Sequence, residues 1–189
     1  MTSHSTEPFS KNDSVAYLEL ISGFTARLHF SNRTLEALIG RNGISNNKHE
    51  GDGTTPAGLL PLRRLLYRSD RLPAPLTTVH CAPLRNDDGW CDDPADSNYN
   101  HQVRLPYPAS HECLWRKDDL YDIIGVLGYN DDLVVSDRGS AIFLHIASPD
   151  KGPTAGCISL SLNDLLWLLK QGLKTIYVST PHNISFVEK

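Results

Sequence analysis

The chain has 189 residues, of which 40% are hydrophobic and 21% are charged. This balance is ordinary for a globular protein, and the length allows a domain to bury roughly 70% of its unfolded surface. The formal net charge of −4 and the pI near 6.0 argue against binding to nucleic acid or to an anionic membrane. The longest apolar runs, residues 141–144 and 165–169, are too short to span a bilayer, so no integral membrane segment is expected.

The 13 glycines and 12 prolines imply many turns, and therefore a mainly β fold with many short strands. Residues 1–13 are polar and are expected to be flexible, whereas residues 14–189 are expected to form a single domain. Strands are expected, in chain order, at residues 15–21, 26–30, 34–39, 58–62, 121–129, 140–147 and 174–180. The first two flank Ser22-Gly23 and predict a hairpin.

Two turn-rich segments interrupt this series of strands. Residues 41–55 form a loop, and Thr55-Pro56-Ala57-Gly58 then predicts a tight turn that leads into the next strand. Residues 65–118 are rich in proline, aspartate and asparagine and have little periodicity, which is typical of a lid, a substrate wall or an insertion. The aspartates of this segment do not follow the EF-hand pattern, so a calcium site is not expected.

One helix is predicted near the C-terminal end of the chain. Residues 161–164, Ser-Leu-Asn-Asp, resemble a capping box, and leucines continue the helical pattern to Leu169. Gly172 is expected to end the helix.

The four cysteines contain no C-x-x-C pair; they are Cys81, Cys91, Cys113 and Cys157. Zinc-type spacing is therefore absent, and a disulfide framework is not expected in a chain that can build a core of this size. We expect free thiols, no metal site and no cofactor.

The N-terminal sequence has no basic stretch followed by an apolar core, so no signal peptide is expected. As written, the protein is expected in the cytoplasm, unless it leaves by a route that needs no cleavable signal. The oligomeric state stays open.

The segment from Arg138 to Ser159 carries the strongest functional signal. His145 ends an apolar strand, Gly152-Pro153 turns the chain, and Cys157 follows Gly156. Such a loop can bring an imidazole beside a thiol, as cysteine nucleophile chemistry requires, and the amides of Gly156 and Cys157 are candidates for an oxyanion hole. The residues alone also allow two other interpretations, a strand-end histidine bonded to the backbone and a buried structural thiol.

Two ordered motifs add to this pattern. The residues His145, Thr154, Gly156, Cys157 and Ile158 match His…Ser/Thr-x-Gly-Cys-Ile/Val, and Thr55-Pro56-Ala57-Gly58 matches an upstream Thr-Pro-x-Gly turn. Over about residues 34–180 the chain resembles the L,D-transpeptidase (YkuD-type) catalytic domain family. The resemblance implies a β-sandwich or barrel with a short helix after the catalytic cysteine. It also implies an acyl-enzyme formed on a peptidoglycan stem tetrapeptide.

The resemblance implies roles for the two central residues. Cys157 would attack the carbonyl between the third stem residue, meso-diaminopimelate, and the terminal D-alanine, while His145 accepts the thiol proton and passes it to the departing D-alanine. A side-chain amine of a second stem would then form a 3→3 cross-link. Water in its place would make the protein an L,D-carboxypeptidase, and a D-amino acid would make it an exchange enzyme, either of which would suit an exported cell-wall toxin. The substrate implies a periplasmic location.

Three positions depart from the common family pattern. Ala155 stands where many members have a second histidine, Ser159 where many have arginine, and Ile146 where a glycine often follows the first histidine. The interval between His145 and Cys157 is also shorter than usual. These departures indicate a divergent subgroup and leave room for a peptidoglycan-binding module without catalysis.

Candidate substrate-binding residues are Arg138, Ser140, Lys151, Trp90 and Tyr129. The two cations are the nearest to the cysteine in sequence and suit the carboxylates of a stem peptide. The two aromatic residues are candidates to line the groove. A hydroxyl of Ser140 or Thr154, or a backbone carbonyl in the loop 148–154, is expected to orient the imidazole.

Overall fold

The computed structural model describes residues 14–180, so the expectations for residues 1–13 and 181–189 lie outside it. The strands are β1 (Val15–Ser22), β2 (Thr25–Phe30), β3 (Arg33–Leu38), β4 (Ile44–Ser45), β5 (Thr55–Pro56), β6 (Gly58–Tyr67), β7 (Cys81–Pro83), β8 (Asp88–Cys91), β9 (Gln102–Arg104), β10 (His111–Cys113), β11 (Ile123–Leu127), β12 (Phe143–Ile146), β13 (Ile158–Leu160) and β14 (Thr175–Val178). One helix, α1 (Leu162–Lys170), follows β13. The predicted mainly β fold class is confirmed.

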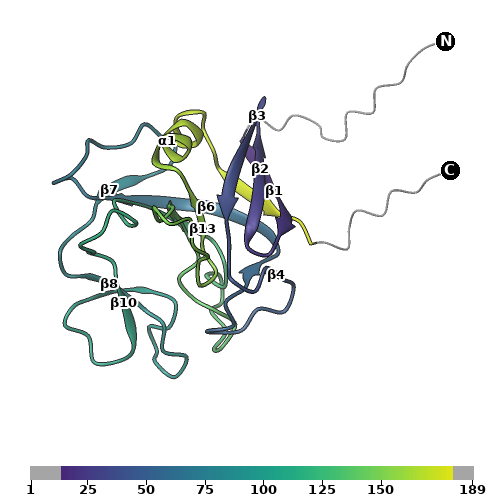
Figure 1. The fold of residues 1–189 in the computed structure, drawn as a ribbon. Coiled ribbons are helices and arrows are strands. Elements are labelled where there is room, and N and C mark those ends of the chain that lie inside the picture. The colour runs from purple at the N-terminus through teal and green to yellow at the C-terminus, as the bar shows by residue number, and fades with distance from the viewer. Residues whose placement is uncertain (1–13, 181–189) are drawn as a thin grey trace, which may run out of the picture.

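Eight strands form a closed sheet, because β11 pairs with β12 on one side and with β6 on the other. The order around the sheet is β11-β12-β13-β3-β2-β1-β14-β6, and β7 is added at β6. In Figure 1, the purple strands β1–β3 lie on one side of the molecule and β8 and β10 on the other, with β6 and β13 between them. Closure removes the unpaired strand edges that an open sheet would present.

The hairpin of β1 and β2, the strands β3 and β6, and the closing strand β14 lie where the sequence predicts them. The prediction missed β13, which has only three residues and begins directly after Cys157. A run this short carries no periodicity, and only its pairing with β12 and β3 makes it a strand.

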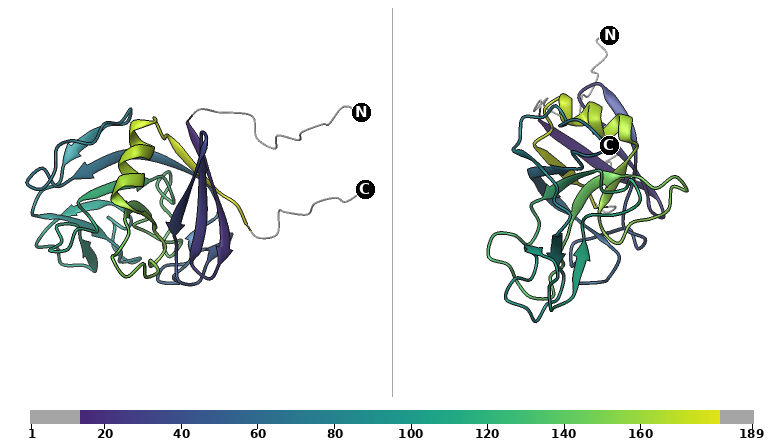
Figure 2. Two further views of the ribbon diagram at one scale, coloured as in Figure 1. Left: turned by 45° about the horizontal axis from the view of Figure 1, so that its top comes forward. Right: turned by 90° about the vertical axis from the view of Figure 1, so that its left-hand side faces the viewer.

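The helix α1 begins and ends as the sequence predicts. The Ser161 side chain accepts a hydrogen bond from the Asp164 amide, and Gly172 adopts a positive φ of 86° just beyond the helix. Leu165, Leu168 and Leu169 are buried against the sheet. Figure 2 shows α1 lying across one side of the strands. At nine residues, this one helix of the described range is too short to cross a membrane.

The segment 65–118 is more ordered than predicted. Residues 65–67 complete β6, and β8, β9 and β10 form a separate three-stranded sheet. This segment supplies Leu84, Trp90 and Leu114 to a second hydrophobic core on the opposite face of β12 from the main core. Of the three roles expected for it, the structure favours that of a wall packed against the sheet.

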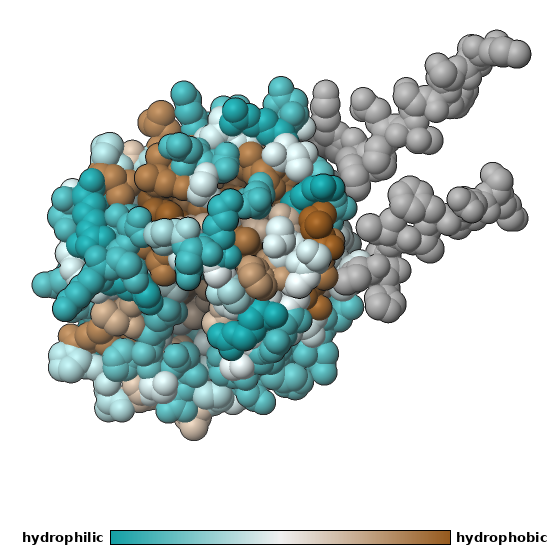
Figure 3. Space-filling model, in the orientation of Figure 1, coloured by the Kyte–Doolittle hydropathy of each residue, from teal (hydrophilic) through white to brown (hydrophobic). Residues whose placement is uncertain are grey.

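The outer surface is mainly hydrophilic on the face that Figure 3 displays, with apolar side chains gathered in small groups between polar ones.

The apolar residues of β12 alternate between the two cores, because successive side chains of a strand point to opposite faces. Leu144 and Ile146 enter the main core, whereas Phe143 enters the second core. His145 is therefore directed to the face covered by the 65–118 segment.

Candidate active site

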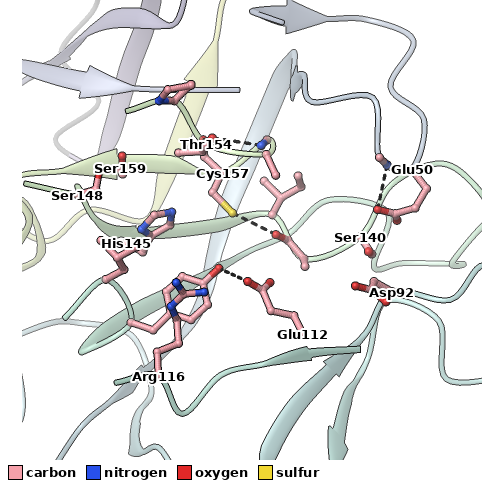
Figure 4. Close-up of a pocket in the computed structure, with 18 of the residues that line it drawn as sticks. Glu50, Asp92, Glu112, Arg116, Ser140, His145, Ser148, Thr154, Cys157 and Ser159 are labelled. Atoms are coloured by element: carbon pink, nitrogen blue, oxygen red, sulfur yellow. Dashed lines mark hydrogen bonds between the residues drawn. The ribbon is translucent and has the colours of Figure 1, made fainter. Parts of the chain in front are cut away.

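The pairing of β12 with β13 brings His145 and Cys157 to the same face of the sheet. In this parallel pair, Leu144 is opposite Ile158 and His145 is opposite Ser159. Cys157 precedes Ser159 by two residues, so its side chain shares the face of Ser159 and of His145. The two residues that the sequence singles out are thus diagonal neighbours across two adjacent strands, and Figure 4 shows them side by side.

The Cys157 thiol is held by two backbone groups near the start of β12. Its Sγ donates a hydrogen bond to the Ala141 carbonyl oxygen at 3.2 Å and accepts one from the Phe143 amide at 3.3 Å. Burial, reinforced by the negative charge of Glu112, raises the pKa of Cys157 to about 12. In the absence of substrate the thiol is therefore protonated.

The His145 imidazole is oriented by its own strand. Its Nδ1 lies 2.8 Å from the carbonyl oxygen of Ile146, so this nitrogen is the protonated one and Nε2 is left to accept a proton. The prediction of an orienting hydroxyl, or of a carbonyl farther along the loop, was wrong. Burial lowers the pKa of His145 to about 4, so the imidazole is neutral at pH 7.

The loop that carries the cysteine is held in shape by Thr154. The Thr154 hydroxyl donates to the Cys157 carbonyl at 2.7 Å and accepts a hydrogen bond from the Gly156 amide at 3.1 Å. This residue acts on the shape of the turn, not on the imidazole. Since the Gly156 amide already has a partner, the structure does not leave it free for the oxyanion hole that the sequence suggested.

Gly156 is required at its position. Its φ is +149°, and a Cβ there would lie 2.8 Å from the Thr54 carbonyl oxygen. The Thr-Pro-x-Gly turn therefore packs directly against the cysteine loop. The Thr55 hydroxyl fixes this contact by donating to the Gly156 carbonyl at 2.8 Å and accepting from the Gly40 amide at 2.9 Å.

A cavity of about 520 Å³ opens beside the cysteine and the histidine. Its walls come from three separate parts of the chain: residues 48–51, residues 92–121 and residues 140–159. Figure 4 shows the Cys157 sulfur between His145 on one side and Glu112 on the other. A thiol, an imidazole and a carboxylate thus lie together in the lining of one cavity.

Tyr121 connects the carboxylate to the imidazole. Its hydroxyl donates to Glu112 Oε1 at 2.6 Å, and its ring meets the His145 ring edge-on at a centroid distance of 5.2 Å. The Arg116 guanidinium lies 5.1 Å from the centre of the Tyr121 ring. Burial raises the pKa of Glu112, whereas the Tyr121 hydroxyl and the Arg116 charge act in the opposite direction.

Of the candidate substrate-binding residues, only Ser140 lines this cavity. Lys151 is directed to Glu36 at 2.7 Å, outside the cavity, and Arg138 is exposed with its carbonyl bonded to the Tyr129 hydroxyl. Trp90 packs edge-on against Phe143 at 5.1 Å in the second core. Trp90 and Tyr129 line a different, smaller cavity of about 170 Å³.

The charged residues that do line the cavity were not predicted from the sequence. Lys48 comes from the loop after β4, and Arg116, Glu112 and Asp92 come from the 65–118 segment. These residues are far from Cys157 in sequence and belong to no motif. No sequence signal placed them near the thiol, because closure of the sheet and the second core bring them there.

The four cysteines are all unpaired thiols. Among residues 14–180, no group of three or more histidine, cysteine, aspartate or glutamate side chains is arranged to hold a metal ion.

A family model of the L,D-transpeptidase catalytic domain (YkuD) matches residues 24–184. Comparisons with curated proteins and with solved structures found no match. The matched range contains both ordered motifs and every strand from β2 to β14. The geometry of the site and the extent of this match lead to one assignment: the chain belongs to the L,D-transpeptidase catalytic domain family.

Proposed function

We propose that this protein is a cysteine acyltransferase acting on peptidoglycan stem tetrapeptides, with Cys157 as nucleophile and His145 as general acid and base. The observation that carries the proposal is the placement of these two side chains on one face of β12 and β13, at the wall of a cavity. Membership of the L,D-transpeptidase family supports the substrate class.

The first half-reaction follows from the state of the two groups. Because the pKa of Cys157 is about 12 and that of His145 about 4, a preformed thiolate–imidazolium pair is disfavoured. The proton therefore moves from Sγ to the free Nε2 as the sulfur attacks the carbonyl of the third stem residue. The S–C bond forms, the C–N bond to D-alanine breaks, and His145 passes the proton to the departing amine.

The second half-reaction releases the acyl group from the sulfur. The side-chain amine of a second stem attacks the thioester and loses its proton to the neutral His145. His145 passes this proton to the sulfur as the S–C bond breaks, which restores the thiol. This sequence yields a 3→3 cross-link. With water as the acceptor, the same steps give a tripeptide and make the protein an L,D-carboxypeptidase; with a free D-amino acid they give exchange.

The test is incubation with a disaccharide-tetrapeptide, followed by mass spectrometry of the products. Loss of D-alanine with formation of a dimer supports transpeptidation, whereas tripeptide without dimer supports hydrolysis. The Cys157→Ala variant should give neither product. The proposal fails if the wild-type protein, shown by mass to have a free Cys157 thiol, releases no D-alanine.

A non-catalytic peptidoglycan-binding module is the competing function, motivated by Ala155 and Ser159. It would bind the tetrapeptide equally well in the wild-type and Cys157→Ala proteins and would never show a mass adduct on Cys157. The exposed Cys113 provides an internal control, because any adduct found there marks nonspecific labelling.

Because the proposed substrate, peptidoglycan, lies in the cell envelope, we propose that the protein acts there.

A further inference from the structure

The charges that line the cavity are unequally paired. Each of the two cationic side chains has a carboxylate partner that does not line the cavity: Lys48 contacts Asp52 at 2.8 Å, and Arg116 contacts Asp118 at 2.7 Å. Within the described residues, the three carboxylates that line the cavity have no ion-pair partner; they are Glu50, Asp92 and Glu112. The cavity therefore presents unbalanced negative charge to an incoming ligand.

Two buried oxygen atoms in the same cavity lack hydrogen bonds. Asp92 Oδ1 and Ser140 Oγ are both shielded from solvent, and neither has a partner among the described residues. Ser140 as a whole is only 6% exposed. Figure 4 shows these two side chains next to each other on the same side of the cavity, with Glu112 between Asp92 and Cys157. Buried polar atoms without partners are destabilising, so a ligand that donates hydrogen bonds here gains affinity.

The position of Ser140 relates these atoms to the nucleophile. Ser140 directly precedes Ala141, whose carbonyl oxygen accepts the hydrogen bond from the Cys157 thiol. Ser140 Oγ therefore belongs to the residue next to the one that holds the thiol, and Asp92 lines the same cavity as Cys157. A group bound there belongs to the residue whose carbonyl is attacked.

We propose that Asp92 and the Ser140 hydroxyl, with Glu112 beside them, form a subsite for the side-chain ammonium group of the acyl donor. An ammonium has three N–H donors and a positive charge, which match a carboxylate and a hydroxyl oxygen. The carboxylate that diaminopimelate carries on the same carbon is left to the two cations that line the cavity, Lys48 and Arg116. The carboxylates are not clustered as metal ligands are, which favours a cation on a carbon stem over a bare metal ion. This subsite rests on the proposed function and gives it a specificity.

The same subsite acts on the nucleophile. The charge of Glu112 contributes to the raised pKa of the thiol, and the charge of Asp92 contributes to the raised pKa of Glu112. An ammonium bound among these groups offsets both effects, so a correct substrate makes the thiol easier to ionise. An amine held by carboxylates stays protonated. This suits the side-chain amine of the acyl donor, which takes no part in the reaction. It does not suit the amine of the acceptor, which must lose its proton to attack.

The test measures binding without chemistry, by calorimetry on the Cys157→Ala protein. The two probes are L-Ala-γ-D-Glu-meso-diaminopimelyl-D-Ala and the same peptide acetylated on the side-chain amine. We expect the free amine to bind about tenfold or more tightly than the acetylated form, and Asp92→Asn to remove most of this preference by weakening only the free-amine peptide. Ser140→Ala should reduce the same preference to a smaller extent.

Asp93→Asn is the matched control, because Asp93 is the adjacent carboxylate but does not line the cavity. An asparagine at this position can still accept the hydrogen bond from the Ala95 amide. It should keep the full preference. The subsite is overturned if the wild-type site binds both peptides with equal affinity. It is also overturned if Asp92→Asn weakens binding of both peptides equally, or if this variant keeps the full preference for the free-amine peptide. D-alanine release by the wild-type protein is measured separately: a preserved amine preference without release would refute the proposed function and leave the subsite standing.

Discussion

The Thr55 hydroxyl donates a hydrogen bond to the Gly156 carbonyl oxygen at 2.8 Å, although the two residues are 101 positions apart. This bond joins the two motifs that the sequence contains. None of the four residues of the upstream turn lines the cavity; Thr55 instead fixes the backbone at Gly156, directly before Cys157. The same hydroxyl accepts from the Gly40 amide, so one buried side chain satisfies groups from two distant loops.

Replacing Thr55 by valine should destabilise the protein and impair catalysis together. Valine keeps the shape but leaves the Gly40 amide and the Gly156 carbonyl unsatisfied, which should lower the free energy of unfolding by about 1–3 kcal/mol. Urea denaturation measures the loss, and D-alanine release measures the effect on Cys157. Thr175→Val should change little, because the Thr175 side chain, on β14, makes no hydrogen bond within residues 14–180. Equal stability of the two variants would contradict the role given to Thr55.

The Cys157 thiol should be unreactive in the free protein. With a pKa of about 12, only about one thiol in 10⁵ is ionised at pH 7, and the sulfur is buried as well. Iodoacetamide should therefore label the exposed Cys113 before Cys157, and the rate at Cys157 should rise with pH. Peptide mapping by mass spectrometry gives both rates. Preferential labelling of Cys157 near pH 7 would mean that the resting site already holds a thiolate.

His145 should make the stability of the protein depend on pH. Its pKa is about 4 when folded and 6.5 when unfolded, so the unfolded state binds the extra proton between these values. Stability from this group is complete above about pH 6.5 and is lost as the pH falls, by at most about 1.4 kcal/mol per pH unit. Urea denaturation at pH 6.5 and 4.5 measures the slope, and a His145→Gln variant should lack this contribution. An identical slope in both proteins would contradict the low pKa.

The low pKa of His145 should also determine how far activity persists on the acid side of the pH profile. In the proposed mechanism the neutral imidazole is the base, so kcat/KM for D-alanine release should stay level from pH 7 to about pH 5 and fall only towards pH 4. A midpoint near 6.5 would show that His145 is solvated in the working enzyme.

Adding a single methyl group at Gly156 should inactivate the protein. A Cβ at this position would lie 2.8 Å from the Thr54 carbonyl oxygen, and the φ of +149° is one that alanine avoids. Gly156→Ala should lower the thermal midpoint and displace Cys157. Gly152→Ala, in the same loop but with its nearest neighbour at 3.5 Å, should retain both stability and D-alanine release. Comparable losses in the two variants would remove the special role of Gly156.

The sequence alone determined the fold class, the N-terminal hairpin, the capped helix and the pair of residues at the centre of the site. These features leave local signals: a hairpin turn at Gly23, a Ser161 cap, and a glycine before Cys157 whose purpose is steric. The family motifs are equally local. They suffice because strand alternation and turn geometry are properties of a few consecutive residues.

Only the tertiary structure decided the surroundings of that pair. The imidazole is oriented by Ile146, not by a hydroxyl, and the charges near the thiol come from Lys48, Glu112 and Asp92, not from Arg138 or Lys151. Such contacts depend on the closure of the sheet and on a second core built from the 65–118 segment. They join residues distant in sequence through packing, which leaves no periodic pattern along the chain, and so proximity in sequence was a poor guide to proximity in the site.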